Sequence, residues 1–133
     1  MTLTDANVLM YAAGIEHPHK ASAVSFLRRV AMGLTDSVVD AETLQEILHR
    51  YRAQRRWADG ERVFDLARTV FPDVLPITAD VMDEARRILS ADDTLMARDA
   101  VHAAVVVVYR LDGIYTFDRD FDRIPGCLRI EPA

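Results

Sequence analysis

Residues 97–116 read ARDAVHAAVVVVYRLDGIYT and carry the strongest structural signal in the chain. The segment from Ala97 to Arg110 is apolar on nearly all sides, which is typical of a helix buried between other elements. Its β-branched run also suits a strand, but its length and the polar residues Asp99 and His102 near its start favour a helix. Gly113 then turns the chain into a short apolar run, which predicts a strand.

The same alternation of strands and helices extends outward along the chain. Short β-branched runs predict strands, and longer segments with apolar residues at i, i+3 and i+4 predict helices. We expect a brief strand that begins at Thr2 and ends at Asp5, further strands over 34–39, 74–77, 114–116 and 127–130, and helices over 18–33, 40–57, 78–89 and 97–110, with one more after Gly60. Such alternation forms a parallel sheet with both faces covered. We therefore expect one α/β domain over residues 1–133, in three layers, with a short, mostly parallel central sheet flanked by helices.

Composition limits the functions that the chain can have. Lys plus Arg number 16 and Asp plus Glu number 21, and the net charge of −5 opposes nucleic-acid binding by bulk charge. Cys127 is the only cysteine, which excludes an intrachain disulfide and a Cys-rich zinc site and predicts a cytoplasmic protein. No apolar stretch approaches the roughly 20 residues that cross a bilayer, and the first residues are unlike a signal peptide. Of the 21 acids, 15 are aspartates, so the function has to account for an excess of short carboxylates.

Four of these carboxylates fall where they can meet. Asp5 ends the first predicted strand, and Asp118 lies just beyond the strand over 114–116. The carboxyl ends of parallel strands share one edge of the sheet, where ligands bind, so we expect both side chains in one crevice. Asp99 lies in the first turn of the buried helix, where the helix dipole favours a carboxylate. Glu46 lies off the apolar stripe of its own helix.

Carboxylates that converge on one crevice repel one another, and a divalent cation removes this conflict. Oxygen ligands without cysteines or paired histidines indicate Mg²⁺ or Mn²⁺ rather than zinc. Two such ions about 4 Å apart can hold the attacking and the leaving oxygen of a phosphodiester. The four acids therefore indicate metal-dependent phosphodiester hydrolysis, with one or two metals.

The neighbours of these acids leave alternatives open. Glu42 competes with Glu46 because it lies one helical turn away, and spacing does not decide whether Asp120 or Asp122 joins the site. His102 lies three residues after Asp99 and suits either a base or a hydrogen-bonded packing histidine.

A basic segment ends the helix predicted over 40–57. Arg50, Arg55 and Arg56 are candidates for RNA contact, because guanidinium groups match phosphate oxygens. A solvated helix end, where the dipole favours cations, explains the same residues.

Four motifs, in this order, resemble those of PIN-domain nucleases. They are Asp5-Ala6-Asn7-Val8-Leu9-Met10-Tyr11-Ala12, then Leu44-Gln45-Glu46-Ile47-Leu48, then Arg98-Asp99-Ala100-Val101-His102-Ala103-Ala104, and finally Thr116-Phe117-Asp118-Arg119-Asp120-Phe121 followed by Ile124-Pro125-Gly126. The resemblance spans nearly the whole chain and implies a PIN-like fold. Size and motif order are most similar to the VapC toxins of bacterial and archaeal toxin–antitoxin pairs.

The resemblance implies an endoribonuclease that depends on Mg²⁺ or Mn²⁺. Its metal and activated water would be held by Asp5, Glu46, Asp99 and Asp118, with supporting roles for Thr116, Asn7 and Asp120. Members of the family commonly cleave structured RNA such as tRNA or ribosomal RNA. They are typically homodimers, and a small VapB-like antitoxin inhibits them by covering the active site.

A non-catalytic α/β module that binds Mg²⁺, either a degenerate PIN scaffold or a receiver-like domain, is the alternative. A receiver needs a lysine late in the chain, but Lys20 is the only lysine and lies too early. A phosphatase of the haloacid-dehalogenase type needs a second aspartate two residues after the first, where this chain has Asn7. Both departures favour the nuclease.

Overall fold

The central sheet has five parallel strands. A computed structural model describes all 133 residues, with β1 (Thr2–Thr4), β2 (Ser37–Asp40), β3 (Val74–Leu75), β4 (Ile114–Tyr115) and β5 (Arg129–Ile130). The strand order is β3-β2-β1-β4-β5, and all four pairings are parallel. Leu3 of β1 pairs with Val38 on one side and Ile114 on the other, so β1 lies at the centre of the sheet.

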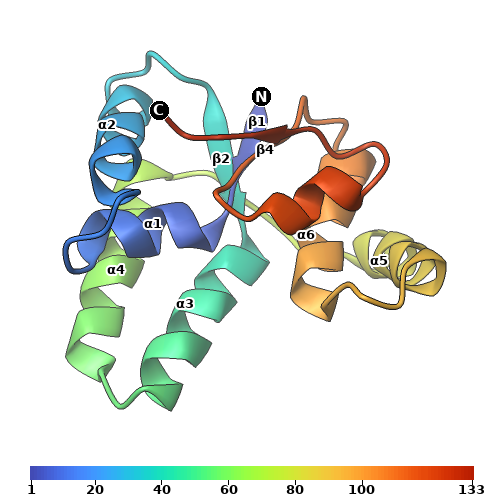
Figure 1. Cartoon of the computed structure of the whole chain (residues 1–133), viewed down its shortest axis with the longest axis horizontal. Helices are drawn as coiled ribbons and strands as arrows, with labels where there is room; N and C mark the ends of the chain where they lie inside the picture. Colours follow the sequence, from blue (N-terminus) through green and yellow to red (C-terminus); the bar gives the residue numbers. More distant parts are fainter.

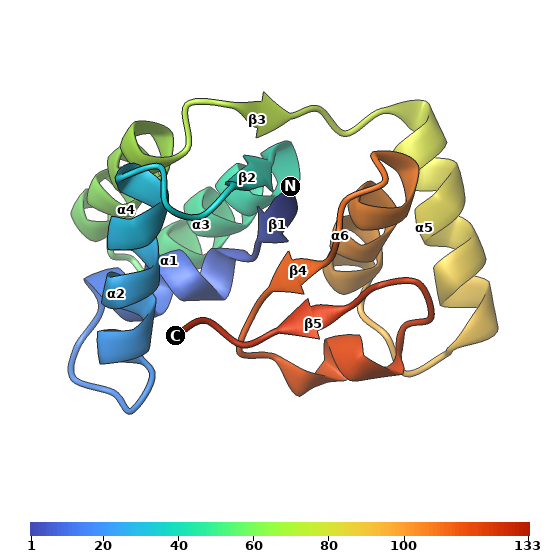
Figure 2. The ribbon, with the colours of Figure 1, turned by 90° about the horizontal axis from the view of Figure 1, so that it is seen from above.

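Helices cover both faces of this sheet. They are α1 (Ala6–Ala13), α2 (Lys20–Ala31), α3 (Ala41–Ala53), α4 (Trp57–Val70), α5 (Ala79–Ala91) and α6 (Ala97–Val108), with a 3₁₀ helix over Arg119–Arg123. Figures 1 and 2 show α5 and α6 on one side of the strands and α1 to α4 on the other. The expected three-layer α/β architecture is confirmed. None of the helices combines the length and apolar character needed to span a membrane.

Each face of the sheet has its own apolar core. Val38 packs with the residues of α5 and α6, whereas its neighbour Val39 packs with those of α1 to α4. Successive side chains of a strand point to opposite faces, so two adjacent valines can supply two cores. The alternation explains how strands of two to four residues anchor a sheet that is covered on both sides.

The helix expected from the 97–116 segment is confirmed as α6. All residues from Asp99 to Val106 are buried, because α6 packs against α5 and against the sheet. Arg110, at φ +54°, adopts the left-handed conformation just after the helix, and Gly113 leads into β4. Burial on all sides explains why an apolar β-branched run is helical here.

The structure has one helix that was not expected, and it divides another region differently from the prediction. Residues 6–13 form α1, which was not expected, and Asp5 occupies the position that precedes its first turn. The helix expected over 40–57 ends at Ala53, and Trp57 begins α4, so Gly60 lies within α4 rather than before it. Gly60 therefore does not mark a turn between two helices; it serves helix packing.

Gly60 allows α3 and α4 to pack closely. A Cβ atom at this position would lie 2.7 Å from Cβ of the buried Tyr51, closer than side chains tolerate. We expect Gly60→Val to lower the free energy of unfolding by about 2 kcal/mol, the usual cost of overpacking. Urea unfolding followed by circular dichroism measures this loss. Ala58→Val, on the exposed side of the same helix, should cost only about 0.5 kcal/mol, and equal losses in the two variants would contradict the packing role.

Candidate active site

Acidic residues gather at the carboxyl edge of the three central strands. Asp40 is the last residue of β2, Asp5 follows β1 directly, and Asp118 follows β4 shortly after its end. The chain reverses its strand order between β1 and β4, and ligands collect at such a point in parallel sheets. Asp5 and Asp118 follow β1 and β4, which are neighbours in the sheet (Figure 2), and this explains why the two residues lie at the same edge.

Thr116 joins the two strand ends by hydrogen bonds. Its Oγ1 donates to Oδ2 of Asp5 at 2.7 Å and accepts from the backbone N–H of Asp118 at 3.0 Å. The same oxygen accepts from Nδ2 of Asn7 at 2.9 Å. Thr116 is completely buried, and its own N–H donates to Ile130 of β5. The hydroxyl thus fixes the positions of three of the residues that the sequence singled out.

Asp99 lies in the first turn of α6 and is buried beside the strand-end acids. Burial, with the nearby charges of Asp5 and Asp118, raises the pKa of Asp99 from 3.8 to about 6. Burial and the charge of Glu46 likewise raise the pKa of Asp5, although His102 opposes the shift. The two carboxylates are therefore held in surroundings that disfavour their negative charge.

Glu46 reaches the same place from α3. Its Oε2 lies 3.5 Å from Nε2 of His102, and that nitrogen lies 3.8 Å from Oδ1 of Asp5. One ligand atom from each of Asp5, Glu46 and His102 lies within 4.8 Å of the others. Glu42 does not belong to this group. Although burial opposes the change, His102 and Arg98 hold the pKa of Glu46 below its usual value.

His102 is completely buried, with Asp5 and Glu46 near one ring nitrogen and Asp40 near the other. Its Nδ1 donates to Oδ2 of Asp40 at 2.8 Å, and Oδ1 of Asp40 accepts from the N–H of Thr43 as the cap of α3. Burial alone would lower the pKa of His102, but Asp40, Glu46 and Asp5 raise it well above its usual value. The sequence did not single out Asp40, although an acid that follows the strand residues Val38 and Val39 satisfies the rule that identified Asp5.

A second group of ligand atoms lies at the start of the 3₁₀ helix. Carboxylate oxygens of Asp99, Asp118 and Asp120 also lie within 4.8 Å of one another. Oδ1 of Asp118 accepts from the N–H of Asp120 at 2.9 Å. Asp122, the competitor of Asp120, instead accepts from Nε of Arg129 at 2.9 Å. The structure thus brings Asp120 to the cluster, with Arg123 3.5 Å from its Oδ1, and turns Asp122 toward Arg129.

The chemistry of these side chains fits a hard divalent cation. The ligand atoms are mostly carboxylate oxygens, the donors that Mg²⁺ and Mn²⁺ prefer. Oδ1 of Asn7 is buried without a hydrogen-bond partner, and Nδ2 of the same amide donates to the Thr116 hydroxyl that holds Asp5. A buried amide oxygen without a partner is costly, and with the raised pKa values of Asp5 and Asp99 it indicates that the site is built for positive charge.

The three candidate arginines differ in position. Arg50 and Arg56 line a hollow of about 330 Å³ together with Asn7, Tyr11 and His17. Arg55 is exposed in a left-handed turn at φ +56° and does not line this hollow. Asn7 lines the hollow and also donates a hydrogen bond to Thr116, so the hollow lies next to the acidic cluster.

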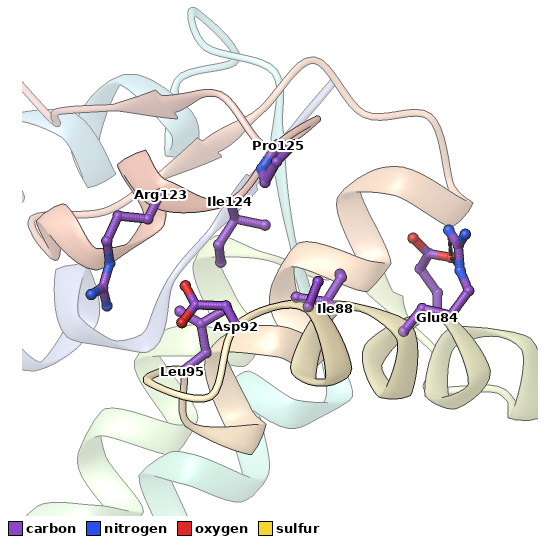
Figure 3. A pocket seen from close by; sticks show the side chains of 9 residues that line it. Glu84, Ile88, Asp92, Leu95, Arg123, Ile124 and Pro125 are labelled. Carbon is purple, nitrogen blue, oxygen red and sulfur yellow. Dashed lines mark hydrogen bonds and ion pairs between the residues drawn. The ribbon is translucent and has the colours of Figure 1, made fainter.

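Another cavity, of about 390 Å³, lies between α5 and the segment that follows the 3₁₀ helix (Figure 3). Its wall includes Ile88 and Leu95 on one side and Arg123, Ile124 and Pro125 on the other. None of the four candidate acids lines it. Since no member of either group of ligand atoms lines this cavity, the candidate active site remains at the carboxyl edge of the strands.

Comparison with known proteins gives consistent results. The PIN domain family matches residues 2–126. Ribonuclease VapC13 of Mycobacterium tuberculosis is 42% identical over 130 residues, which cover 98% of this chain and 99% of that protein. Ribonuclease VapC23 of the same species is 31% identical over 118 residues, which cover 89% of this chain and 93% of that protein.

Two solved structures share the fold. M. tuberculosis VapC20, described as a toxin that cleaves the sarcin–ricin loop, superposes with a TM-score of 0.79 at 18% identity over 99% of this chain and 100% of its own. VapBC2 from Rickettsia felis, bound to a DNA fragment of its promoter, superposes with a TM-score of 0.77 at 14% identity over 99% of this chain and 98% of that chain. The family match and the 42% identity over almost the whole length show that the chain belongs to the PIN-domain family and, within it, to the VapC ribonucleases.

Proposed function

We propose that this protein is a metal-dependent endoribonuclease and the toxin of a VapBC-type toxin–antitoxin pair. The observation that carries the proposal is the cluster of Asp5, Glu46, Asp99 and Asp118, whose ligand atoms lie in two neighbouring groups at the carboxyl edge of the sheet. The 42% identity to a VapC ribonuclease supports the same conclusion.

The four acids are proposed to hold Mg²⁺ or Mn²⁺. When bound, such an ion supplies an activated water and neutralises the charge that develops on the phosphate. The protein contributes a prearranged site, because Thr116 holds Asp5 and Asp118 at distances of 2.7 and 3.0 Å. Asn7 and Asp120 support the cluster from its two sides, through Thr116 and through Asp118 respectively.

RNA is proposed to approach across the hollow beside α1. Arg50 and Arg56 can bind phosphates there, and Tyr11 and His17, whose ring centroids lie 4.4 Å apart, form an aromatic part of the same wall. Arg55, on the adjoining turn, adds a third positive charge. These contacts, with a bound cation, overcome the net charge of −5 where a phosphate must bind. Structured cellular RNA, tRNA or ribosomal RNA, is the proposed substrate.

The proposed partners are a VapB-like antitoxin and a second copy of the chain. A VapBC pair is present in the R. felis structure that shares this fold. Apolar side chains exposed on α5 and α6, Met82 at 49% and Val107 at 37%, support a protein interface on this side. We place the protein in the cytoplasm, where its RNA substrates are, and its single buried cysteine needs no oxidising compartment.

Cleavage of RNA by protein freed of metal tests the proposed function. We expect no cleavage of total tRNA or ribosomal RNA in EDTA and recovery of cleavage, by at least about 100-fold, when Mg²⁺ or Mn²⁺ is restored, since the ion supplies several kcal/mol to such reactions. Gel analysis of end-labelled RNA measures both rates. Unchanged cleavage in EDTA would contradict the proposal. A metal-dependent rise in melting temperature without cleavage would instead identify a degenerate, non-catalytic scaffold.

A further inference from the structure

We propose that His102 and Asp40 form a buried positioning pair that holds Glu46 in the orientation needed to bind the metal. This inference rests on the proposed function and concerns two residues outside its four acids. The pair joins two elements that are distant in the sequence, since Asp40 caps the start of α3 and His102 lies in the second turn of α6.

The imidazole ring of His102 is held in one orientation. His102 is completely buried, with Nδ1 at 2.8 Å from Asp40 and Nε2 at 3.5 Å from Glu46. Both ring nitrogens therefore face carboxylates. A rotation of the ring that moved Nε2 away from Glu46 would also break the short contact with Asp40, so one contact fixes the other.

Asp40 is anchored by Thr43. Its Oδ1 accepts from the N–H of Thr43 at 2.8 Å and from the Thr43 hydroxyl at 3.2 Å, which leaves Oδ2 for His102. Asp40 is completely buried and caps the helix that carries Glu46. The pair therefore sets the position of α3 relative to α6, and with it the position of Glu46 relative to Asp99.

Glu46 has a weaker basic partner than His102. The other cation within ion-pair distance of this carboxylate is Arg98, whose Nε lies 3.7 Å from Oε1 on a side chain that is 46% exposed. An exposed ion pair of this length is screened by solvent and orients its partner weakly. A buried ion pair adds little stability compared with apolar packing, so His102 and Asp40 are better explained by orientation. Metal-binding carboxylates are commonly held in this way by an outer layer of hydrogen bonds.

Two substitutions of His102 distinguish its contact with Asp40 from its contact with Glu46. The amide nitrogen of His102→Asn lies near the place of Nδ1 and keeps the contact with Asp40, but no atom reaches Glu46. His102→Gln places its amide near Nε2 and can still reach Glu46. We expect His102→Asn to weaken Mn²⁺ binding by about 10–100-fold and His102→Gln to recover part of the loss, both measured by titration with the electron paramagnetic resonance signal of free Mn²⁺.

Asp40→Asn tests the other half of the pair. Asparagine keeps the size of the side chain and the oxygen that caps α3. The effect of the pair on Mn²⁺ binding can therefore be measured in this variant even if His102→Asn is less stable. We expect weaker Mn²⁺ binding, and no further loss in the double variant with His102→Asn, because Asp40 acts through His102. Asp83→Asn, which removes the same charge from the exposed face of α5, is the matched control and should bind Mn²⁺ as the parent does.

The kinetic readout separates orientation from a general structural defect. Saturating Mn²⁺ should restore kcat of His102→Asn to within a few-fold of the parent, because the loss lies in metal affinity. Parent-like Mn²⁺ binding by His102→Asn would overturn the proposal, as would fully additive losses in the double variant. A nitrogen coupling from His102 to bound Mn²⁺ would also overturn it, since the ring would then be a ligand. If the parent binds Mn²⁺ but does not cleave RNA, the proposed nuclease fails while the affinity comparison still tests the pair.

Discussion

Replacement of Asp5 by asparagine is expected to lower the rate of RNA cleavage by at least about 10³-fold. Asp5 contributes Oδ1 to the group with Glu46 and His102, while Thr116 holds its Oδ2. Asparagine keeps the shape and can accept the Thr116 hydrogen bond, but it lacks the charge that binds the cation. Loss of metal-based stabilisation costs several kcal/mol, and each 1.4 kcal/mol lowers the rate about tenfold.

Single-turnover cleavage of end-labelled RNA measures this loss. Asp83→Asn, which removes the same charge from the exposed face of α5, is the matched control and should cleave as the parent does. The melting temperature of Asp5→Asn in EDTA should equal or exceed that of the parent, because burial and Glu46 disfavour the charge of Asp5. Activity within tenfold of the parent would show that Asp5 does not bind the catalytic metal.

Asp99→Asn is expected to change activity and stability in opposite directions. Cleavage should fall by about 10³-fold, for the reason given for Asp5. The metal-free protein should nevertheless become more stable at pH 7, by about 1–2 kcal/mol. The difference between a pKa of 3.8 and one of about 6 corresponds to at most about 3 kcal/mol, and solvent at the edge of the site reduces this value.

The sign of the pH effect follows from proton binding. The pKa of Asp99 is higher in the folded protein than in the unfolded chain, so the folded state binds more protons between about pH 4 and pH 6. The contribution of Asp99 to the free energy of unfolding therefore decreases as the pH rises through this window. Asp99→Asn removes the titrating group, so its advantage over the parent should be close to zero at pH 4 and reach its full value above pH 6.

Urea unfolding of both proteins in EDTA, at pH 4 and at pH 7, measures this advantage. Saturating Mn²⁺ should reverse the order at pH 7, because the parent binds the ion in its folded state and gains stability from it. Asp83→Asn again serves as the control for loss of one charge. An Asp99→Asn protein that is less stable than the parent at pH 7 in EDTA would show that the site does not strain the Asp99 charge.

The fold could be predicted from the sequence where local pattern and tertiary packing agree. The segment over 97–108 is long, apolar and bounded by polar residues, and it forms α6 as expected. The hydrophobic pattern did not predict the helix over residues 6–13. A helix of eight residues that follows a three-residue strand has too few periodic positions to be distinguished from that strand. The pattern also failed at Gly60, where the residue allows a neighbouring helix to approach and does not mark a turn.

The sequence by itself determined that acids follow the strands at Asp5 and Asp118 and open a buried helix at Asp99, because strand ends and helix starts are local features. Only the tertiary structure decided which neighbours join them. It brings Glu46 rather than Glu42 to Asp5, turns Asp122 toward Arg129, and places His102 against Asp40, which lies 62 residues earlier in the chain. These contacts depend on how α3, α6 and the strands pack together, and distance along the chain does not encode that arrangement.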